Sequence, residues 1–228
     1  LLRDLKNVKT VGIIKNDKEK GITEIAKPVG IVGAVTPSTN PAATPINNII
    51  NALKGRNSII VAPHPRAKLT NKKICDLMRS AIVSCGAPAD LVQGIEIPSL
   101  DLTNELMAQC DRVLATGGGA MVTAAYSSGT PALGVGVGNA VITVDETADL
   151  DDAAEKIRIS KTLDFAASCS SDNSVILVNE IYENMMSKLK EKGGYLVNDE
   201  EKEKLKNTLW DDEGHINTAM VAQPAEKI

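Results

Sequence analysis

The regular alternation of short apolar runs with longer amphipathic stretches constrains the fold more than any other feature of this chain. The runs are rich in β-branched residues, have the length of buried strands and lie next to Pro or Gly. They occupy residues 28–37, 58–65, 91–97 and 112–119. Apolar residues at helical spacing follow each run, near residues 42–55, 68–85, 100–110 and 120–129. Four strand–helix repeats predict a parallel sheet with right-handed crossovers and helices on both faces, the layout of a dinucleotide-binding domain.

The pattern restarts after a glycine-rich segment. The further expected elements are a helix over 150–166, a turn and strand over 169–179 and a helix over 180–192. The ends, 1–25 and 199–228, are charged and less regular. We therefore predict an α/β chain with a dinucleotide-binding domain at 1–140 and part of a second α/β domain at 141–228. Because the chain begins without Met and stops at AEKI, we interpret it as a piece of a longer protein.

Composition argues against several classes of protein. The net charge of −4 and the absence of a basic stripe argue against a nucleic-acid partner. No apolar run approaches the roughly 20 residues that a membrane-spanning helix needs. The four cysteines have no CxxC pair and only two histidines accompany them, which argues against a zinc site. Without a signal peptide or a disulfide framework, we expect free thiols in a reducing cytoplasm.

In a parallel sheet, ligands bind outside the carboxyl ends of the strands. Those ends are TPSTN, APHP and TGGG, so His64 and Gly118 are candidate ligand-binding residues. Asn40 follows the first of these ends, where Asn is usually a helix cap, although its amide could also hold an oxyanion. The glycines of TGGGAMV let a ligand approach a helix N-terminus, but they do not match GxGxxG.

Two other motifs leave an ordinary structural explanation open. GVGVGN has Gly at 134, 136 and 138, so one face of this segment carries no side chains, which suits tight strand packing or a ligand equally well. Cys169 lies in AASCSSDNS, at a boundary between helix and strand. A cysteine is more often a small buried hydrophobe, but small polar neighbours favour a nucleophile here. Cys75, Cys85 and Cys110 lie in or beside apolar helical patterns and are expected to be structural.

Together, these segments resemble the CoA-acylating branch of the aldehyde dehydrogenase superfamily, including the aldehyde-oxidising half of bifunctional aldehyde-alcohol dehydrogenases. The segments that carry the resemblance are VTPSTNP, APHPRAK, ATGGGAMVTAAYSSGTPALGVGVGN and SKTLDFAASCSSDNSVI. The resemblance covers nearly the whole chain and implies an aldehyde dehydrogenase-like fold, with 141–228 as the first half of a catalytic domain. It also implies that the family's N-terminal segment, the rest of its catalytic domain and its oligomerisation strands are absent here.

The resemblance also implies the site. It places the nucleophile at Cys169 and the oxyanion amide at Asn40. Its expected dinucleotide contacts are Val35, Thr36, Pro37, Ser38, Thr39, His64, Gly118 and Gly136. His64 stands where hydrolytic relatives have a lysine on the adenosine ribose. The implied reaction converts an aldehyde, CoA and NAD(P)⁺ to acyl-CoA and NAD(P)H in a cytoplasmic homodimer or homotetramer, or inside a bacterial microcompartment.

Two departures from hydrolytic relatives refine this expectation. Val135 stands where those relatives have the Glu that activates water, so a CoA thiol is the expected acyl acceptor. Ala67, between Arg66 and Lys68, stands where they have an acidic residue on the ribose, so NAD is expected and NADP is also compatible. The polar SCSSDN segment favours a small polar or anionic aldehyde, sulfoacetaldehyde or succinate semialdehyde. The alternatives are acetaldehyde, a glutamyl-phosphate reductase-like reaction and an inert nucleotide-binding fragment.

Overall fold

A computed structural model describes residues 2–136 and 138–228. The chain divides into two compact units, Leu1–Val137 and Gly138–Ile228. The boundary between domains predicted from the sequence is at 140. Each unit has its own sheet and its own buried cluster, so each is described by itself. In the described part of the chain, no helix is long and apolar enough to cross a membrane.

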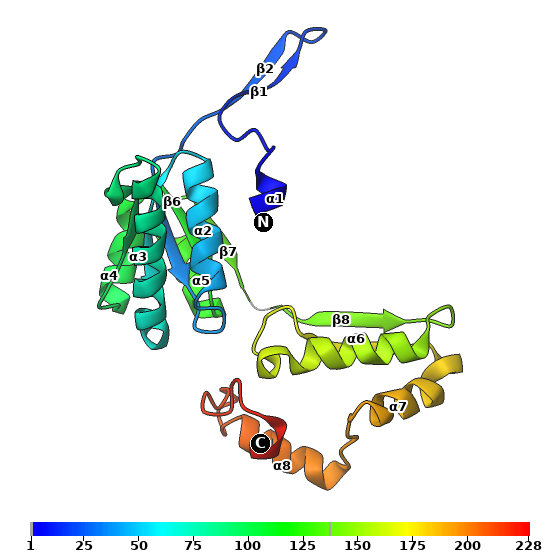
Figure 1. Cartoon of the computed structure of the whole chain (residues 1–228). Coiled ribbons are helices and arrows are strands. Elements are labelled where there is room, and N and C mark those ends of the chain that lie inside the picture. Colours follow the sequence, from blue (N-terminus) through cyan, green and yellow to red (C-terminus); the bar gives the residue numbers. More distant parts are fainter. Residues whose placement is uncertain (1, 137) are drawn as a thin grey trace. The chain divides into compact units, whose positions relative to one another are not determined.

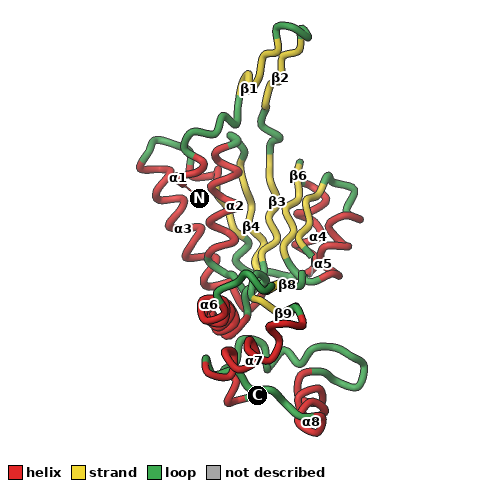
Figure 2. Tube along the Cα trace, turned by 90° about the vertical axis from the view of Figure 1, so that its right-hand side faces the viewer, coloured by secondary structure: helices red, strands yellow, loops and turns green. Residues whose placement is uncertain are grey.

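A five-stranded parallel sheet forms the centre of the first unit, in the order β5-β4-β3-β6-β7 (Figures 1 and 2). Its strands are β3 (Ile31–Thr36), β4 (Ser58–Pro63), β5 (Val92–Gly94), β6 (Arg112–Thr116) and β7 (Ala132–Val135). Its helices are α2 (Ala43–Lys54), α3 (Lys68–Ser84), α4 (Leu100–Gln109) and α5 (Gly119–Ser127), with the short 3₁₀ turns η1 (Pro65–Ala67) and η2 (Ala89–Leu91). The predicted parallel α/β fold is confirmed, with α2 and α3 on one face and α4 and α5 on the other.

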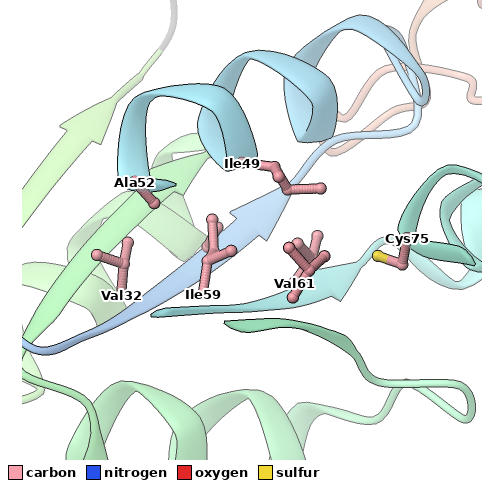
Figure 3. Close-up of a cluster of buried hydrophobic side chains, with 8 residues drawn as sticks. Val32, Ile49, Ala52, Ile59, Val61 and Cys75 are labelled. Atoms are coloured by element: carbon pink, nitrogen blue, oxygen red, sulfur yellow. The ribbon is translucent and has the colours of Figure 1, made fainter. Parts of the chain in front are cut away.

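Alternation along β3 supplies a core on both faces of the sheet. Val32 packs with Ile49 and Ala52 of α2 in one buried cluster (Figure 3), whereas Val35 belongs to the cluster that contains α4 and α5. Aliphatic side chains of this kind suit strands that are covered on both sides. On the α4 side, Gly33 leaves room for close contact between helix and strand.

A hairpin in the first 30 residues was not predicted. After a short helix α1 (Leu2–Leu5), strands β1 (Gly12–Asp17) and β2 (Ile22–Ala26) pair antiparallel. The tight turn between them has Gly21 at φ +66°, and the Asp17 carboxylate accepts a hydrogen bond from the Lys20 N–H at 3.0 Å. The isoleucines of the hairpin are about half exposed. Charged residues lie between them in the sequence, so no strand-like apolar pattern was visible.

The second unit contains two parallel strands, β8 (Ala140–Val144) and β9 (Asp172–Leu177). Its helices are α6 (Leu150–Thr162), α7 (Tyr182–Glu191) and α8 (Asp199–Leu209), with the 3₁₀ segments η3 (Leu163–Ala166), η4 (Asn179–Ile181) and η5 (Ala225–Lys227). Helix α6 ends four residues earlier than predicted, because Asp164, Phe165 and Ala166 adopt left-handed φ values of 49°, 52° and 59°.

Helix α8 lies in the C-terminal tail, 199–228, which was predicted to be less regular. Asn198 accepts a hydrogen bond from the Glu201 N–H, and the Glu201 carboxylate accepts one from the Asn198 N–H, each at 2.9 Å. This reciprocal pair is a capping box, and its sequence signature was present in the chain. The helix has no buried residue, so the apolar periodicity that normally reveals a helix is weak here.

Candidate functional site

The sheet of the first unit has a cavity of about 320 Å³ at the carboxyl ends of its central strands. The walls come from the ends of β3, β4 and β6 and from the start of α4. Chain order reverses at β3, because β4 lies on one side of it and β6 on the other. In open α/β sheets, this reversal opens a crevice that receives nucleotide ligands. The cavity therefore lies where a dinucleotide-binding sheet holds its ligand.

Five of the eight residues expected to contact a dinucleotide line this cavity. They are Val35, Thr36, Pro37, His64 and Gly118. The ends of two strands are joined by a hydrogen bond from the His64 N–H to the Thr36 carbonyl at 3.0 Å. The remaining three, Ser38, Thr39 and Gly136, are exposed and do not line it.

His64 has a fixed orientation at the mouth of the cavity. Its Nδ1 accepts a hydrogen bond from the Arg66 N–H at 3.2 Å and thereby caps the 3₁₀ turn η1. A ring nitrogen that accepts is unprotonated, so the proton of the neutral ring is on Nε2. The exposed ring can donate a hydrogen bond from Nε2 while it still supports the turn.

Gly118 combines an open position with the start of a helix. It is the residue before α5, and a Cβ added to it would have no neighbour within 4 Å. The first turn of α5 carries no acidic residue. Helix N-termini attract anions through free N–H groups and the helix dipole, so a phosphate group fits this position.

The start of α4 forms a further wall of the cavity, which was not predicted from the sequence. Pro98, Ser99, Leu100 and Thr103 line the cavity, and Ser99 caps α4 by accepting a hydrogen bond from the Leu102 N–H at 3.1 Å. The Thr103 hydroxyl donates to the Ser99 carbonyl at 2.8 Å. Since β5 is also a parallel strand, applying the carboxyl-end rule to IEIPS would have found this wall.

Asn40 does not cap a helix. The residue before α2 is Ala42, without a side-chain hydrogen bond, and the Asn40 carbonyl accepts from the Thr44 N–H at 3.2 Å. Among the described residues, the half-buried Asn40 amide has no hydrogen-bond partner of its own. The capping role that the sequence favoured is therefore wrong, and the amide is free to bind another group.

The three glycines of GVGVGN serve different purposes. A Cβ on Gly134 would lie 2.6 Å from Val122 Cγ1 and 2.9 Å from Tyr126 Cε2, so Gly134 is needed for packing against α5. A Cβ on Gly136 or Gly138 would meet nothing within 4 Å. Packing thus explains the first glycine and leaves the other two positions open to a ligand.

Cys169 lies on an exposed polar turn of the second unit. The Ser171 N–H donates to the Ser168 carbonyl at 3.1 Å and closes the turn around Cys169 and Ser170. The Ser168 and Ser170 hydroxyl oxygens are 2.9 Å apart. After the turn, the Asp172 N–H donates to the Ser160 hydroxyl of α6 at 3.2 Å, which ties the start of β9 to the helix.

All four cysteines are free, and they fall into two classes. Burial raises the pKa of the Cys75 thiol to about 11 and also raises the pKa of Cys110. These two are structural, as predicted. The expectation for Cys85 was wrong, because it is exposed at the end of α3. Cys169 and Cys85 are therefore the two thiols that solvent and reagents can reach.

A larger groove, of about 830 Å³, follows α8 and the loop to Gly214. It contains none of the candidate site residues, and one helix and its adjoining loop line it with both charged and apolar side chains. The smaller cavity at the sheet is the better ligand site, because several strand ends and a helix N-terminus converge there.

Known proteins match this chain over nearly its whole length. It is 53% identical to a sulfoacetaldehyde dehydrogenase from an Acholeplasma species, over 100% of this chain and 48% of that protein. It is 44% identical to the succinate-semialdehyde dehydrogenase (acetylating) of Clostridium kluyveri, over 98% of this chain and 49% of that protein. The chain thus spans about half the length of the curated relatives it matches.

Solved structures agree. An acetylating aldehyde dehydrogenase from Geobacillus thermoglucosidasius has a TM-score of 0.93 at 39% identity, covering 99% of this chain and 50% of that one. A Rhodopseudomonas palustris propionaldehyde dehydrogenase, solved with bound CoA and an acylated cysteine, has a TM-score of 0.80 at 34% identity, covering 87% and 46%. The aldehyde dehydrogenase family model matches residues 3–208. The resemblance seen in the sequence is thereby confirmed, and the chain belongs to the aldehyde dehydrogenase family.

Proposed function

We propose that the protein to which this chain belongs oxidises an aldehyde and transfers the acyl group to CoA. In the balanced reaction, aldehyde, CoA and NAD(P)⁺ give acyl-CoA, NAD(P)H and a proton. The observation that carries the proposal is the position of Cys169, which is exposed on a serine-rich turn while Cys75 and Cys110 are buried. A thiolate is a strong nucleophile toward a carbonyl, and a nucleophile must be accessible to its substrate.

Two hydrogen-bond donors of this chain would stabilise the negative charge that develops on the aldehyde oxygen during the reaction. The Cys169 sulfur forms a bond to the aldehyde carbon, and the carbonyl oxygen becomes an oxyanion. The free amide of Asn40 and the backbone N–H of Cys169 are the proposed donors to that oxygen. Loss of hydride leaves a thioester on Cys169, which the CoA thiol attacks to release acyl-CoA and restore the Cys169 thiol.

A dinucleotide, when bound, accepts the hydride. The cavity at the sheet fits such a group, because five of the expected contact residues line it and Gly118 leaves space beside a helix N-terminus. We propose NAD as the main cofactor with NADP also accepted. Arg66 and Lys68 form no ion pair with any described residue, and Ala67 between them is buried, so no carboxylate there would repel a phosphate on the ribose.

The absence of a carboxylate at Val135 supports transfer to CoA rather than to water. Val135 is the last residue of β7 and is 57% exposed. A valine cannot take a proton from water, so hydrolysis of a thioester would lack a general base at this position. A thiol needs less activation, because part of it is already ionised near neutral pH.

For the substrate, we propose a small polar or anionic aldehyde, with sulfoacetaldehyde first, succinate semialdehyde second and acetaldehyde as runner-up. The hydroxyls of Ser168 and Ser170 flank Cys169 and can donate to a charged head group. Relatives at 53% and 51% identity are named as sulfoacetaldehyde dehydrogenases. We place the protein in the cytoplasm as a homodimer or homotetramer. A microcompartment is the alternative location, since a propionaldehyde dehydrogenase of 34% identity comes from one.

The test is an aldehyde panel on the intact protein with NAD or NADP, with and without CoA. We expect acyl-CoA and reduced cofactor in equal amounts, with sulfoacetaldehyde preferred and little turnover without CoA. Cys169→Ala should abolish acyl-CoA formation, whereas Cys85→Ala, the matched change at the other exposed thiol, should retain it. Activity in the Cys169→Ala protein would refute the nucleophile, CoA-independent turnover would refute the acyl acceptor, and exclusive use of an acyl phosphate would identify a different reaction.

A further inference from the structure

Ser171, two residues after Cys169, has a buried hydroxyl without a hydrogen-bond partner. The residue is 3% exposed, and its Oγ forms no hydrogen bond with any described residue. Most buried hydroxyls in folded proteins are paired, since leaving one unpaired forfeits the bonds that it made to water. A serine that only filled space could be replaced by alanine without that cost, so this hydroxyl calls for a functional explanation.

The backbone around Ser171 is held on both sides. Before the turn, three consecutive left-handed residues, 164–166, reverse the chain after α6. After it, the Asp172 N–H bonds to the Ser160 hydroxyl at 3.2 Å and β9 begins. Within it, the Ser171 N–H bonds to the Ser168 carbonyl at 3.1 Å. These contacts fix the backbone of the turn, whereas no hydrogen bond to a described residue holds the exposed Cys169 side chain.

We propose that Ser171 is a positioning residue for Cys169. When the Cys169 side chain rotates toward Ser171, the Ser171 hydroxyl donates a hydrogen bond to its sulfur. Because Cys169 lies on the exposed side of the turn, the bonded sulfur stays within reach of an aldehyde or an alkylating reagent. A hydroxyl that donates to sulfur stabilises the charged form, which is the form that attacks a carbonyl. The inference rests on Cys169 being the nucleophile.

Among the polar groups of the turn, Ser171 is the best available hydrogen-bond donor to the Cys169 sulfur. Ser168 and Ser170 already share a hydrogen bond with each other, and the Ser160 hydroxyl already accepts one from Asp172. The Cys169 thiol forms no hydrogen bond with any described residue. The turn therefore contains one unpaired donor and one unpaired sulfur, two residues apart.

The experiment compares Ser171→Ala and Ser171→Thr in the intact protein. The first readout is the alkylation rate of Cys169 by iodoacetamide at neutral pH, resolved by peptide mass spectrometry. Cys85, the other exposed thiol, serves as the internal reference. Loss of a hydrogen bond to a charged group predicts a rate about ten- to a hundredfold lower for Cys169 in Ser171→Ala, with no change at Cys85. Ser171→Thr keeps the hydroxyl and should restore most of the rate.

Two further measurements separate positioning from a structural role. Ser171→Ala should unfold at the same temperature as the parent protein or higher, because it removes an unpaired buried hydroxyl. Ser174→Ala is the matched control. Ser174 lies on β9, three residues after Ser171, and its hydroxyl already accepts a hydrogen bond from the Asn139 amide at 3.3 Å, so the Cys169 rate in this variant should be unchanged. A folded Ser171→Ala protein with the parental alkylation rate at Cys169 would overturn the proposal. Alkylation is measured without turnover, so failure of the enzymatic proposal would be seen separately, as acyl-CoA formation that survives Cys169→Ala.

Discussion

Replacement of Gly33 by alanine should destabilise the first unit, because α4 packs directly against this position of β3. An added Cβ would lie 2.8 Å from Cys110 Sγ, 3.1 Å from Leu106 Cγ and 3.4 Å from Cys110 Cβ. Favourable contacts between carbon atoms begin near 3.5 Å, so the contacts with Cys110 Sγ and Leu106 Cγ are too short, whereas the contact with Cys110 Cβ is close to an ordinary one. Overpacking of this kind costs about 1–3 kcal/mol, and the lower chain entropy of alanine in the unfolded state returns about 0.4–1 kcal/mol. We expect a net loss of about 1–2 kcal/mol.

The surroundings of Gly33 leave few routes of relaxation. Cys110 Sγ is held by weak hydrogen bonds to the Met107 and Arg112 carbonyls at 3.8 and 3.5 Å, and Leu106 belongs to a buried cluster. Native-state hydrogen exchange of β3 and β4 peptides measures the loss, because these buried strands open only when the unit unfolds. The reasoning can be refuted by a double mutant. Cys110→Ala removes the shortest contact, so the two changes together should cost less than the sum of their separate effects by 0.5 kcal/mol or more. Strict additivity would show that Gly33 and Cys110 do not compete for the same space.

Five further substitutions test the site and its supports. Asn40→Ala should lower acyl-CoA formation about 10²–10³-fold while the melting temperature stays constant, since its amide has no partner in the described fold; a fall in stability would point to a structural role instead. Gly118→Ala should weaken dinucleotide binding in titration calorimetry without loss of stability, whereas Gly134→Ala should destabilise by about 1–3 kcal/mol because of its contacts with α5. Stability should fall as pH rises from about 9 to 11, because the Cys75 thiol, with its pKa raised to about 11, stays protonated in the folded state while the unfolded chain ionises from the ordinary value of 9.0. The loss would be about 2–3 kcal/mol, and urea titrations of Cys75→Ala should lack this part of the pH dependence. Ala166→Gly should raise stability by about 1 kcal/mol in urea unfolding, because glycine adopts the left-handed φ of 59° without strain; a lower stability would contradict the strain.

The parallel sheet was predictable because its strands are short, β-branched and separated by well-marked helices. Ile59 and Val61 of β4 are fully buried, and both lie in one of the apolar runs that the sequence shows. The β1–β2 hairpin was not predictable by the same reasoning. Its strands are exposed on both faces, and charged residues such as Lys15 and Glu24 interrupt the apolar pattern. Periodicity reports burial, so elements that bury little remain hidden from it.

Much of the candidate cofactor cavity also followed from the sequence, since topology fixes where strand ends converge. Thr36 and His64 lie at the ends of adjacent parallel strands, and their convergence follows from strand order alone. The contribution of α4 required the observed cap at Ser99, because a serine before a helix has the same appearance whether or not a ligand is near. For Asn40 the usual statistics gave the wrong result. Only the observed start of α2, with Ala42 as the residue before it, shows that the amide is unused.

The turn that carries Cys169 shows where local sequence signals fail. Gly and Asn are the residues that most often adopt a left-handed backbone conformation, yet residues 164–166 are Asp-Phe-Ala. The apolar pattern therefore predicted a helix that continued through them. Each such residue costs about 1–2 kcal/mol relative to a right-handed conformation. Strain of this size persists only where the surrounding structure determines the backbone, and such positions concentrate at functional sites. The unpaired hydroxyl of Ser171 adds a second cost within the same short segment. Two unfavourable features on either side of one exposed thiol are difficult to explain as packing, because a relaxed helix and an alanine would fold at lower cost. They are explained if the backbone is set to hold Cys169 outside the helix and within reach of a donor.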